Sequence, residues 1–258
     1  MDGPHRPDGY QPAISSYGFL SDCYSAALVD RRGSVDWWCV PRFDSPSVFG
    51  RLLDPAAGHW TLRPVGDFSA ERRYVGDSLV LETVHRTATG TVTVRDALLL
   101  EPGARGHRIG RVSPHALLRQ VEGVQGSVRM ATELSPRMEY GRTEPHLRLV
   151  SGGAEATGGP VTLNLRTHIP LQVQGGAVIA EFEVAEGATV DLQLSYAQTF
   201  DGGGQRPGPD PSVADTLDGW TSWAAQHTDY DGDYPDLVGR SSLVLQGLTY
   251  GPSGAVVA

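Results

Sequence analysis

The sequence predicts a mainly β protein, an antiparallel sandwich or barrel of short strands with helices only at its C-terminal end. From Phe19 to Thr199, short runs rich in Val, Leu and Thr alternate with turns that contain Gly, as in antiparallel sheets. Long helical segments do not alternate with these runs, which argues against a parallel doubly wound sheet. Apolar residues at helical spacing begin only after a Gly- and Pro-rich segment at 201–211.

The expected strands follow one another with tight turns between them. The clearest runs are Ser78–Thr87, Thr91–Leu100, His115–Glu122, Ser127–Leu134, Val161–Thr167, Ala177–Val184 and Thr189–Gln198. We expect a turn at Gly123–Gly126 because two glycines punctuate the apolar pattern there. One short helix is expected at Pro46–Leu53.

An early hairpin contains both cysteines of the chain. Its expected turn is 30–33, with Gly33 in the left-handed conformation and Asp30 paired with Ser34. In that register Cys39 faces Ser25, and Cys23 lies diagonal to Cys39 at roughly 7 Å, too far for a disulfide. We therefore expect two free, buried thiols, although a register shifted by two residues would change this prediction.

Two helices are expected after the linker at 201–211. Asp210 is a suitable N-cap with Pro211 at the first helical position, and apolar residues then share one face at helical spacing: Val213, Leu217, Trp220 and Ala224. A second helix is expected from about Tyr234, ended by Gly251 and Pro252. Its apolar stripe contains Leu237, Leu245 and Leu248.

Composition excludes several classes of function. The 258 residues contain 21 basic and 30 acidic side chains, a net charge of -9 without a basic cluster, so nucleic acid is not an expected partner. All basic residues are Arg, and the absence of Lys excludes Schiff-base chemistry and the phosphate loop that ends in Gly-Lys. The polar tail at 1–12 is no signal peptide, and no apolar run of about 20 residues occurs, so we expect a cytoplasmic protein without membrane contact.

Local motifs give few candidates for chemistry. Neither a His-Glu-x-x-His nor a Cys-x-x-Cys pattern is present, so neither a metal nor a cofactor is expected. The glycines at 202–204 and Gly208 have the wrong spacing for a dinucleotide loop. Glu139 and Glu144 could form a catalytic pair, but carboxylates on a β domain usually belong to its solvated face.

One segment is unusual enough to indicate a family. Residues 34–49, Ser-Val-Asp-Trp-Trp-Cys-Val-Pro-Arg-Phe-Asp-Ser-Pro-Ser-Val-Phe, concentrate aromatic, Pro and Asp residues at a strand end. Together with Ser-Tyr-Gly-Phe-Leu-Ser-Asp-Cys at 16–23, this segment closely resembles the trehalase-like N-terminal domain of bacterial glycoside hydrolase family 15 enzymes, the glucoamylase and trehalase group. The resemblance returns at 237–258, beginning with Arg240 and Ser241.

The resemblance implies an antiparallel β-sandwich, a helical linker and a catalytic α/α barrel of twelve helices. On this division, 1–12 is a polar tail, 13–200 the β-sandwich, 201–211 a flexible linker, 212–232 a linker helix and 233–258 the start of a truncated barrel. Hydrolysis in the family is inverting, with a general acid and a general base both supplied by the barrel. Both glutamates would lie beyond Ala258, so no catalytic residue is assigned to this chain, whose implied partners are its own barrel and an α-glucoside.

The loop after the aromatic strand is the candidate site. Arg42, Phe43, Asp44 and Ser45 either help to form the sugar pocket or only dock the β domain on the barrel. Trp37 or Trp38 could stack on a sugar ring, but neighbours on a strand face opposite ways, so at most one can do so. Trehalose is the favoured substrate and malto-oligosaccharides are the second choice. The competing interpretation is a stand-alone carbohydrate-binding or interaction module.

Overall fold

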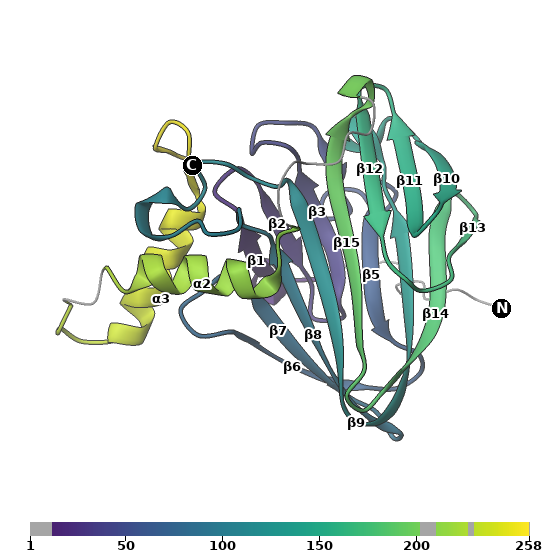
Figure 1. Cartoon of the computed structure of the whole chain (residues 1–258), viewed down its shortest axis with the longest axis horizontal. Coiled ribbons are helices and arrows are strands. Elements are labelled where there is room, and N and C mark those ends of the chain that lie inside the picture. The colour runs from purple at the N-terminus through teal and green to yellow at the C-terminus, as the bar shows by residue number, and fades with distance from the viewer. Residues whose placement is uncertain (1–11, 202–209, 227–229, 258) are drawn as a thin grey trace.

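The computed structural model describes residues 12–201, 210–226 and 230–257, and the expected antiparallel β architecture is confirmed there. Most of the expected tail at 1–12 and of the expected linker at 201–211 lies outside the described residues. Fifteen strands form one antiparallel sheet (Figure 1). They are β1 (Gly18–Ser21), β2 (Ala26–Val29), β3 (Ser34–Cys39), β4 (Ser47–Phe49), β5 (His59–Pro64), β6 (Ser69–Tyr74), β7 (Leu81–Arg86), β8 (Gly90–Leu98), β9 (Ala116–Ser135), β10 (His146–Val150), β11 (Gly153–Gly158), β12 (Val161–Arg166), β13 (Gln172–Gln174), β14 (Ala177–Ala185) and β15 (Thr189–Gln198).

The helical elements are short or lie near the C-terminus. They are η1 (Ile14–Ser16), η2 (Gly106–Arg108), α1 (Met138–Gly141), η3 (Thr199–Asp201), α2 (Val213–Ala224) and α3 (Pro235–Gly247), and a small hairpin of β16 (Thr249–Tyr250) and β17 (Ala255–Val256) follows α3. None of the helices among the described residues is long and apolar enough to cross a membrane.

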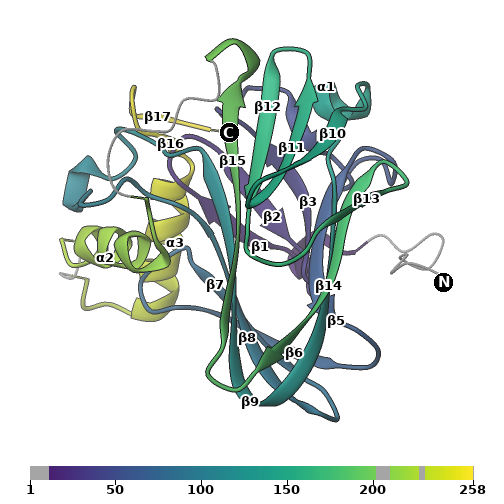
Figure 2. The ribbon, with the colours of Figure 1, turned by 45° about the vertical axis from the view of Figure 1, so that its right-hand side comes forward.

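Strand β9 joins the two halves of the sheet. Its first part pairs with β8 and β15, and its second part, from Ser127 onward, pairs with β14 and β5 (Figure 2). The main path of the sheet is β1-β2-β3-β5-β9-β15-β12-β11-β10. Residues from both halves share one large core, so the sheet curves around the main hydrophobic cluster of the protein.

The expected turn at Gly123–Gly126 is wrong, because β9 continues through these residues. Gly123 instead allows the neighbouring hairpin between β14 and β15 to approach closely. A Cβ atom at Gly123 would lie 2.0 Å from the carbonyl oxygen of Ala185, and the amide of Gly123 donates to the carbonyl of Ala188 at 2.9 Å. Gly123 is therefore required by a contact between strands rather than by a chain reversal. Gly126 has a φ of 66°, and a Cβ atom there would lie 2.4 Å from the carbonyl oxygen of Thr89.

The early hairpin has the expected turn but a different register. The amide of Asp30 donates to the carbonyl of Ser34 at 2.8 Å, and Gly33 has a φ of 80°. A bulge between Leu28 and Val29 then shifts the pairing by one residue, so the expected alignment of the cysteines is wrong. Both thiols are nevertheless free and buried, as expected. Burial is the main cause that raises the pKa of Cys23 to about 12 and of Cys39 to about 11.

The expected helix at Pro46–Leu53 is also wrong. The segment forms β4, in which Ser47 pairs with Cys39 and Phe49 pairs with Trp38. Val48 and Phe49 are buried in the main core. Pairing with β3 therefore overrides the local helical pattern.

Helix α2 begins two residues later than expected. Ser212 is its N-cap and forms a capping box with Asp215, so Asp210 caps nothing here and instead pairs with Arg166. Trp220 is fully buried, and it lies with Leu79, Leu100 and Ile109 in a second core cluster. Helix α2 therefore packs on the β domain itself.

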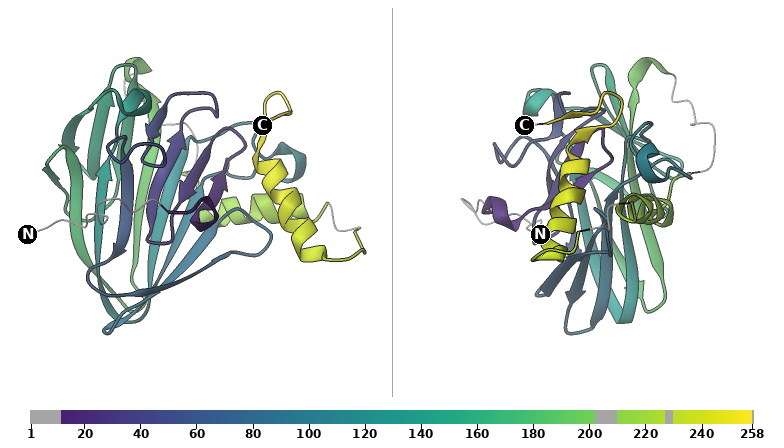
Figure 3. Two further views of the ribbon diagram at one scale, coloured as in Figure 1. Left: turned by 180° about the vertical axis from the view of Figure 1, so that it is seen from behind. Right: turned by 90° about the vertical axis from the view of Figure 1, so that its left-hand side faces the viewer.

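Helix α3 lies beside α2 at one end of the sheet (Figure 3) and ends at Gly247, before the expected stop. Arg240 of α3 donates to the carbonyl oxygens of Ser78 at 2.5 Å and Gly76 at 3.0 Å. The Ser21 hydroxyl donates to the carbonyl of Gly247 at 2.6 Å. The apolar stripe expected on α3 faces outward, because Leu237 and Leu245 are exposed while Leu243 is buried.

Candidate functional site

The loop between β3 and β4 is fixed at its base and exposed at its tip. Trp38, just before the loop, is fully buried, and its indole N–H donates to the Ser25 hydroxyl at 3.3 Å. The amide of Phe43 donates to the carbonyl of Tyr24 at 2.8 Å. The loop also closes on itself, since the Arg42 amide donates to the Ser45 hydroxyl at 3.1 Å. The backbone therefore holds the side chains at the tip in a defined place.

Arg42 and Asp44 form a bidentate ion pair at this tip. The Nε and Nη2 atoms of Arg42 each lie 2.9 Å from one oxygen of Asp44. Both side chains are more than half exposed, at 51% and 71%. The hydrogen bonds and charge of Asp44 raise the pKa of Arg42. The pair thus presents donors and acceptors side by side to solvent, an arrangement that suits neighbouring hydroxyl groups of a sugar.

Four aromatic residues form a row next to this ion pair, and we call Tyr250, Tyr24, His115 and Tyr196 the aromatic row. The Arg42 guanidinium lies over the Tyr250 ring, 5.1 Å from its centroid. Ring centroids along the row are 5.2 Å apart for Tyr250 and Tyr24, 5.3 Å for Tyr24 and His115, and 6.2 Å for His115 and Tyr196. All these ring pairs meet edge to face, the geometry that aromatic quadrupoles favour.

The buried carboxylate of Asp22 fixes the backbone at two residues of the aromatic row. Asp22 accepts hydrogen bonds from the amides of Tyr24 at 2.9 Å and Ser25 at 2.8 Å, and from the hydroxyl of Ser113. That hydroxyl in turn accepts from the amide of His115 at 2.8 Å. Burial raises the pKa of Asp22, against the opposing effect of these hydrogen bonds. One carboxyl group therefore fixes the backbone of two row members.

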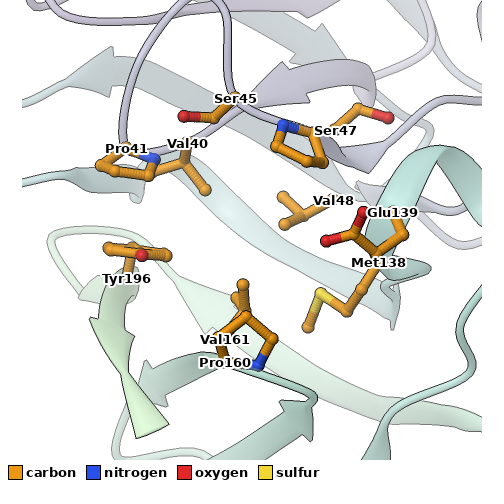
Figure 4. Close-up of a pocket in the computed structure, with 11 residues that line it drawn as sticks. Val40, Pro41, Ser45, Ser47, Val48, Met138, Glu139, Pro160, Val161 and Tyr196 are labelled. Carbon is orange, nitrogen blue, oxygen red and sulfur yellow. The ribbon is translucent and has the colours of Figure 1, made fainter. Parts of the chain in front are cut away.

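A small pocket lies on the β4 side of the same loop (Figure 4). Its volume is about 170 Å³. It is lined by Val40, Pro41, Ser45, Pro46, Ser47, Val48, Met138, Glu139, Pro160, Val161 and Tyr196. The loop thus contributes Arg42 and Asp44 to the ion pair and Pro41, Ser45 and Pro46 to this pocket, and Tyr196 belongs to both the row and the pocket.

The predicted site residues differ in how far they are buried. Arg42, Asp44 and Ser45 lie together, and Phe43 is half-buried beside them. Trp38 is fully buried and offers no ring face to a ligand, whereas Trp37 is half-buried, so stacking by this pair rests on Trp37.

Sequence reasoning missed the aromatic row entirely. A local signal was present at Tyr250 and His115, which stand directly beside chain breakers, before Gly251 and after Pro114. Of the carboxylates considered as a catalytic pair, Glu139 lines the pocket and Glu144 pairs with Arg137 at 3.5 Å.

Fold and surface together define a β-rich domain that presents an arginine–carboxylate loop beside aromatic rings. Residues 9–174 match the family described as trehalase-like, N-terminal, and the chain belongs to that family. It is 37% identical over 276 residues to a trehalase of Mycolicibacterium smegmatis, covering 96% of this chain and 40% of that protein. It is 34% identical over 270 residues to a trehalase of Mycobacterium tuberculosis, covering 96% of this chain and 39% of that protein. The chain thus spans about two fifths of the length of these relatives.

Proposed function

We propose that this chain is the N-terminal part of a glycoside hydrolase of family 15 that hydrolyses α-glucosidic bonds with inversion, with trehalose as substrate. The observation that supports the proposal most strongly is the match of 96% of the chain to two proteins named trehalase. In this proposal residues 13–200 form the β-sandwich domain, the segments up to 232 link the domains, and 233–258 begin an α/α barrel. The barrel supplies both catalytic carboxyl groups, one as acid and one as base.

The β domain would contribute binding rather than acid–base chemistry. Arg42 and Asp44 are exposed, mutually oriented and held by the loop, so they can bind sugar hydroxyls with little loss of conformational entropy. The proposed role is to orient the glucosyl ring at the boundary of the β domain and the barrel. Such contacts raise the rate when they strengthen in the transition state.

The test is hydrolysis of trehalose by the full-length protein, followed by proton NMR of the anomers at early times. Inversion at one anomeric carbon releases one β-glucose, and the leaving glucose keeps its α configuration. Equal early amounts of the two anomers support the proposal, whereas α-glucose alone would indicate retention. Maltose and soluble starch, assayed in parallel, test the choice of trehalose, which is wrong if either is hydrolysed with the higher kcat/KM.

The 258-residue chain provides the second arm of this test. It should release no glucose from any of the three substrates, since the proposal places both catalytic carboxyl groups outside it. Multiple turnovers by the isolated chain, in a preparation free of host glycosidases, would contradict the proposal. A full-length protein that binds these sugars and cleaves none of them would favour the binding-module interpretation.

A further inference from the structure

We propose that the pocket between the loop after β3 and strands β12 and β15 is a binding site for a single sugar ring, separate from the Arg42–Asp44 ion pair. Pro41, Ser45 and Pro46 line it, whereas Arg42 and Asp44 do not. Its volume of about 170 Å³ is below the roughly 300–1,000 Å³ of sites for drug-sized ligands. One hexose ring fits that scale better than a disaccharide does.

The walls of the pocket match the two kinds of surface on a sugar ring. Apolar side chains form much of the lining, among them Val40, Val48, Met138 and Val161. These side chains suit the C–H face of a sugar, and the ring of Tyr196 adds an aromatic wall. Glu139 is exposed at the mouth of the pocket, and Figure 4 shows its carboxyl group turned toward the pocket, where it can accept hydrogen bonds from hydroxyl groups at the ring edge.

Glu139 is available to a ligand. Two other glutamates, Glu144 and Glu155, are paired with arginines, Glu144 with Arg137 at 3.5 Å and Glu155 with Arg148. Within the part of the chain that the structure describes, no arginine or histidine forms an ion pair with Glu139. Hydrogen bonds from a ligand therefore do not compete with an existing salt bridge.

The backbone holds Glu139 in place at a conformational cost. Glu139 and Tyr140 have φ values of 54° and 58°, in the left-handed region that residues with side chains seldom adopt. Met138 and Thr143 exchange two backbone hydrogen bonds, of 2.8 and 3.1 Å, and so close the turn that contains them. The turn therefore aims Glu139 from a fixed base rather than from a free loop.

A neutral sugar suits this lining better than a cation does. An aromatic cage for an ammonium group needs several ring faces, and Tyr196 is the one aromatic residue of the lining. The choice of glucose among sugars rests on the proposed function. The inference that the pocket binds one neutral sugar ring rests on the size and lining of the pocket and does not depend on that function. Such a site would hold a glucosyl unit on the β domain without cleaving it.

The experiment is calorimetric titration of the 258-residue chain with glucose, with trehalose as a second probe. We expect saturable, millimolar binding of glucose, weakened at least fivefold in Glu139→Gln, as for loss of a charged hydrogen bond. Glu144→Gln is the matched control, because it removes a carboxylate of the same turn region that does not line the pocket. Val161→Phe, which fills the pocket from β12, should abolish binding while Glu139 remains.

Two outcomes would overturn the proposal. They are no saturable binding of glucose, or equal affinity of the wild type and Glu139→Gln for glucose. Circular dichroism of each variant checks that the fold is intact, and if Glu139→Gln does not fold, Val161→Phe decides. If this chain does not bind glucose, the proposal that the full-length protein hydrolyses trehalose still stands. If the full-length protein hydrolyses no trehalose, the proposed glucose site still stands, so the two proposals are tested separately.

Discussion

The guanidinium of Arg42 stacks on the ring of Tyr250, at 5.1 Å from its centroid, and so joins the loop after β3 to the hairpin that follows α3. The same guanidinium is bound by Asp44 through two hydrogen bonds of 2.9 Å. A residue that binds a ligand from this position has both its backbone and its side chain restrained in advance.

On the proposed function, Asp44→Asn in the full-length protein should reduce kcat/KM for trehalose by roughly tenfold to a hundredfold, the effect of losing a charged hydrogen bond. The melting temperature should stay nearly unchanged, because the ion pair is exposed. Asp210→Asn is the control, since Asp210 forms a similar exposed bidentate pair with Arg166. If Asp44→Asn lowers the melting temperature and leaves the kinetics normal, the loop docks domains and does not bind sugar.

Arg119 and Asp96 form a fully buried ion pair at 2.8 Å between β9 and β8. Arg119 also donates to the carbonyls of Trp60 at 2.8 Å and Gly33 at 2.9 Å. Asp96→Asn should lower the free energy of unfolding by about 3–5 kcal/mol, because a buried charge is left without its partner. Urea denaturation measures this, with Glu155→Gln at an exposed pair as the control, expected to cost less than about 1 kcal/mol. Similar losses for both variants would contradict the expectation.

His85 is buried, and neither ring nitrogen has a hydrogen-bond partner among the described residues. Burial, with the charge of Arg119, lowers its pKa from 6.5 to about 4. The unfolded chain therefore binds more protons than the folded one in this interval. The stability that neutral His85 contributes is complete above pH 6.5 and is lost as the pH falls toward 4.

The size of this effect is about 3 kcal/mol, from the shift in pKa. Unfolding in urea between pH 7.5 and 4.5 should show it as falling stability. His85→Leu should flatten that part of the profile without lowering stability at neutral pH, because no hydrogen bond is removed. The same slope in the wild type and in His85→Leu would assign the pH dependence to other groups.

Removal of residues 201–258 should destabilise the β domain. Trp220, Trp223 and Leu243 cover Leu79 and Leu100 in the second core cluster, and deletion would expose that apolar surface. Light scattering should show more self-association for the shortened chain.

Within the intact chain, Trp220→Ala should lower the free energy of unfolding by about 3–5 kcal/mol. Leu237→Ala, at an exposed position, should lower it by less than about 0.5 kcal/mol. A shortened chain as stable and monomeric as the intact one would refute the prediction that residues 201–258 stabilise the β domain.

Local chemistry made some features predictable. The turn at 30–33 depends on one glycine in the left-handed conformation, and the sequence alone identifies it. The position of Arg42 and Asp44 in a loop followed from the breakers around them. The same reasoning failed at Gly123, because the residue that requires a glycine there is Ala185, far along the chain.

The aromatic row could not be predicted for a related reason. Tyr24, His115, Tyr196 and Tyr250 come from four separate segments, and only the topology of the sheet brings them together. The outward face of α3 was misjudged in a different way. Helical spacing defines a stripe, but Leu243 rather than Leu237 is buried, because Ser21 and Arg240 set the rotation of the helix on the β domain.

The shared strand β9 has a consequence for how this chain is made. Strands β5 and β8 both pair with β9, yet both are synthesised before it. At about 5–20 residues per second, their free edges wait several seconds for a partner. During this interval each nascent chain is open to pairing with another. Slower growth at low temperature, which reduces the number of such chains present together, should raise the soluble yield.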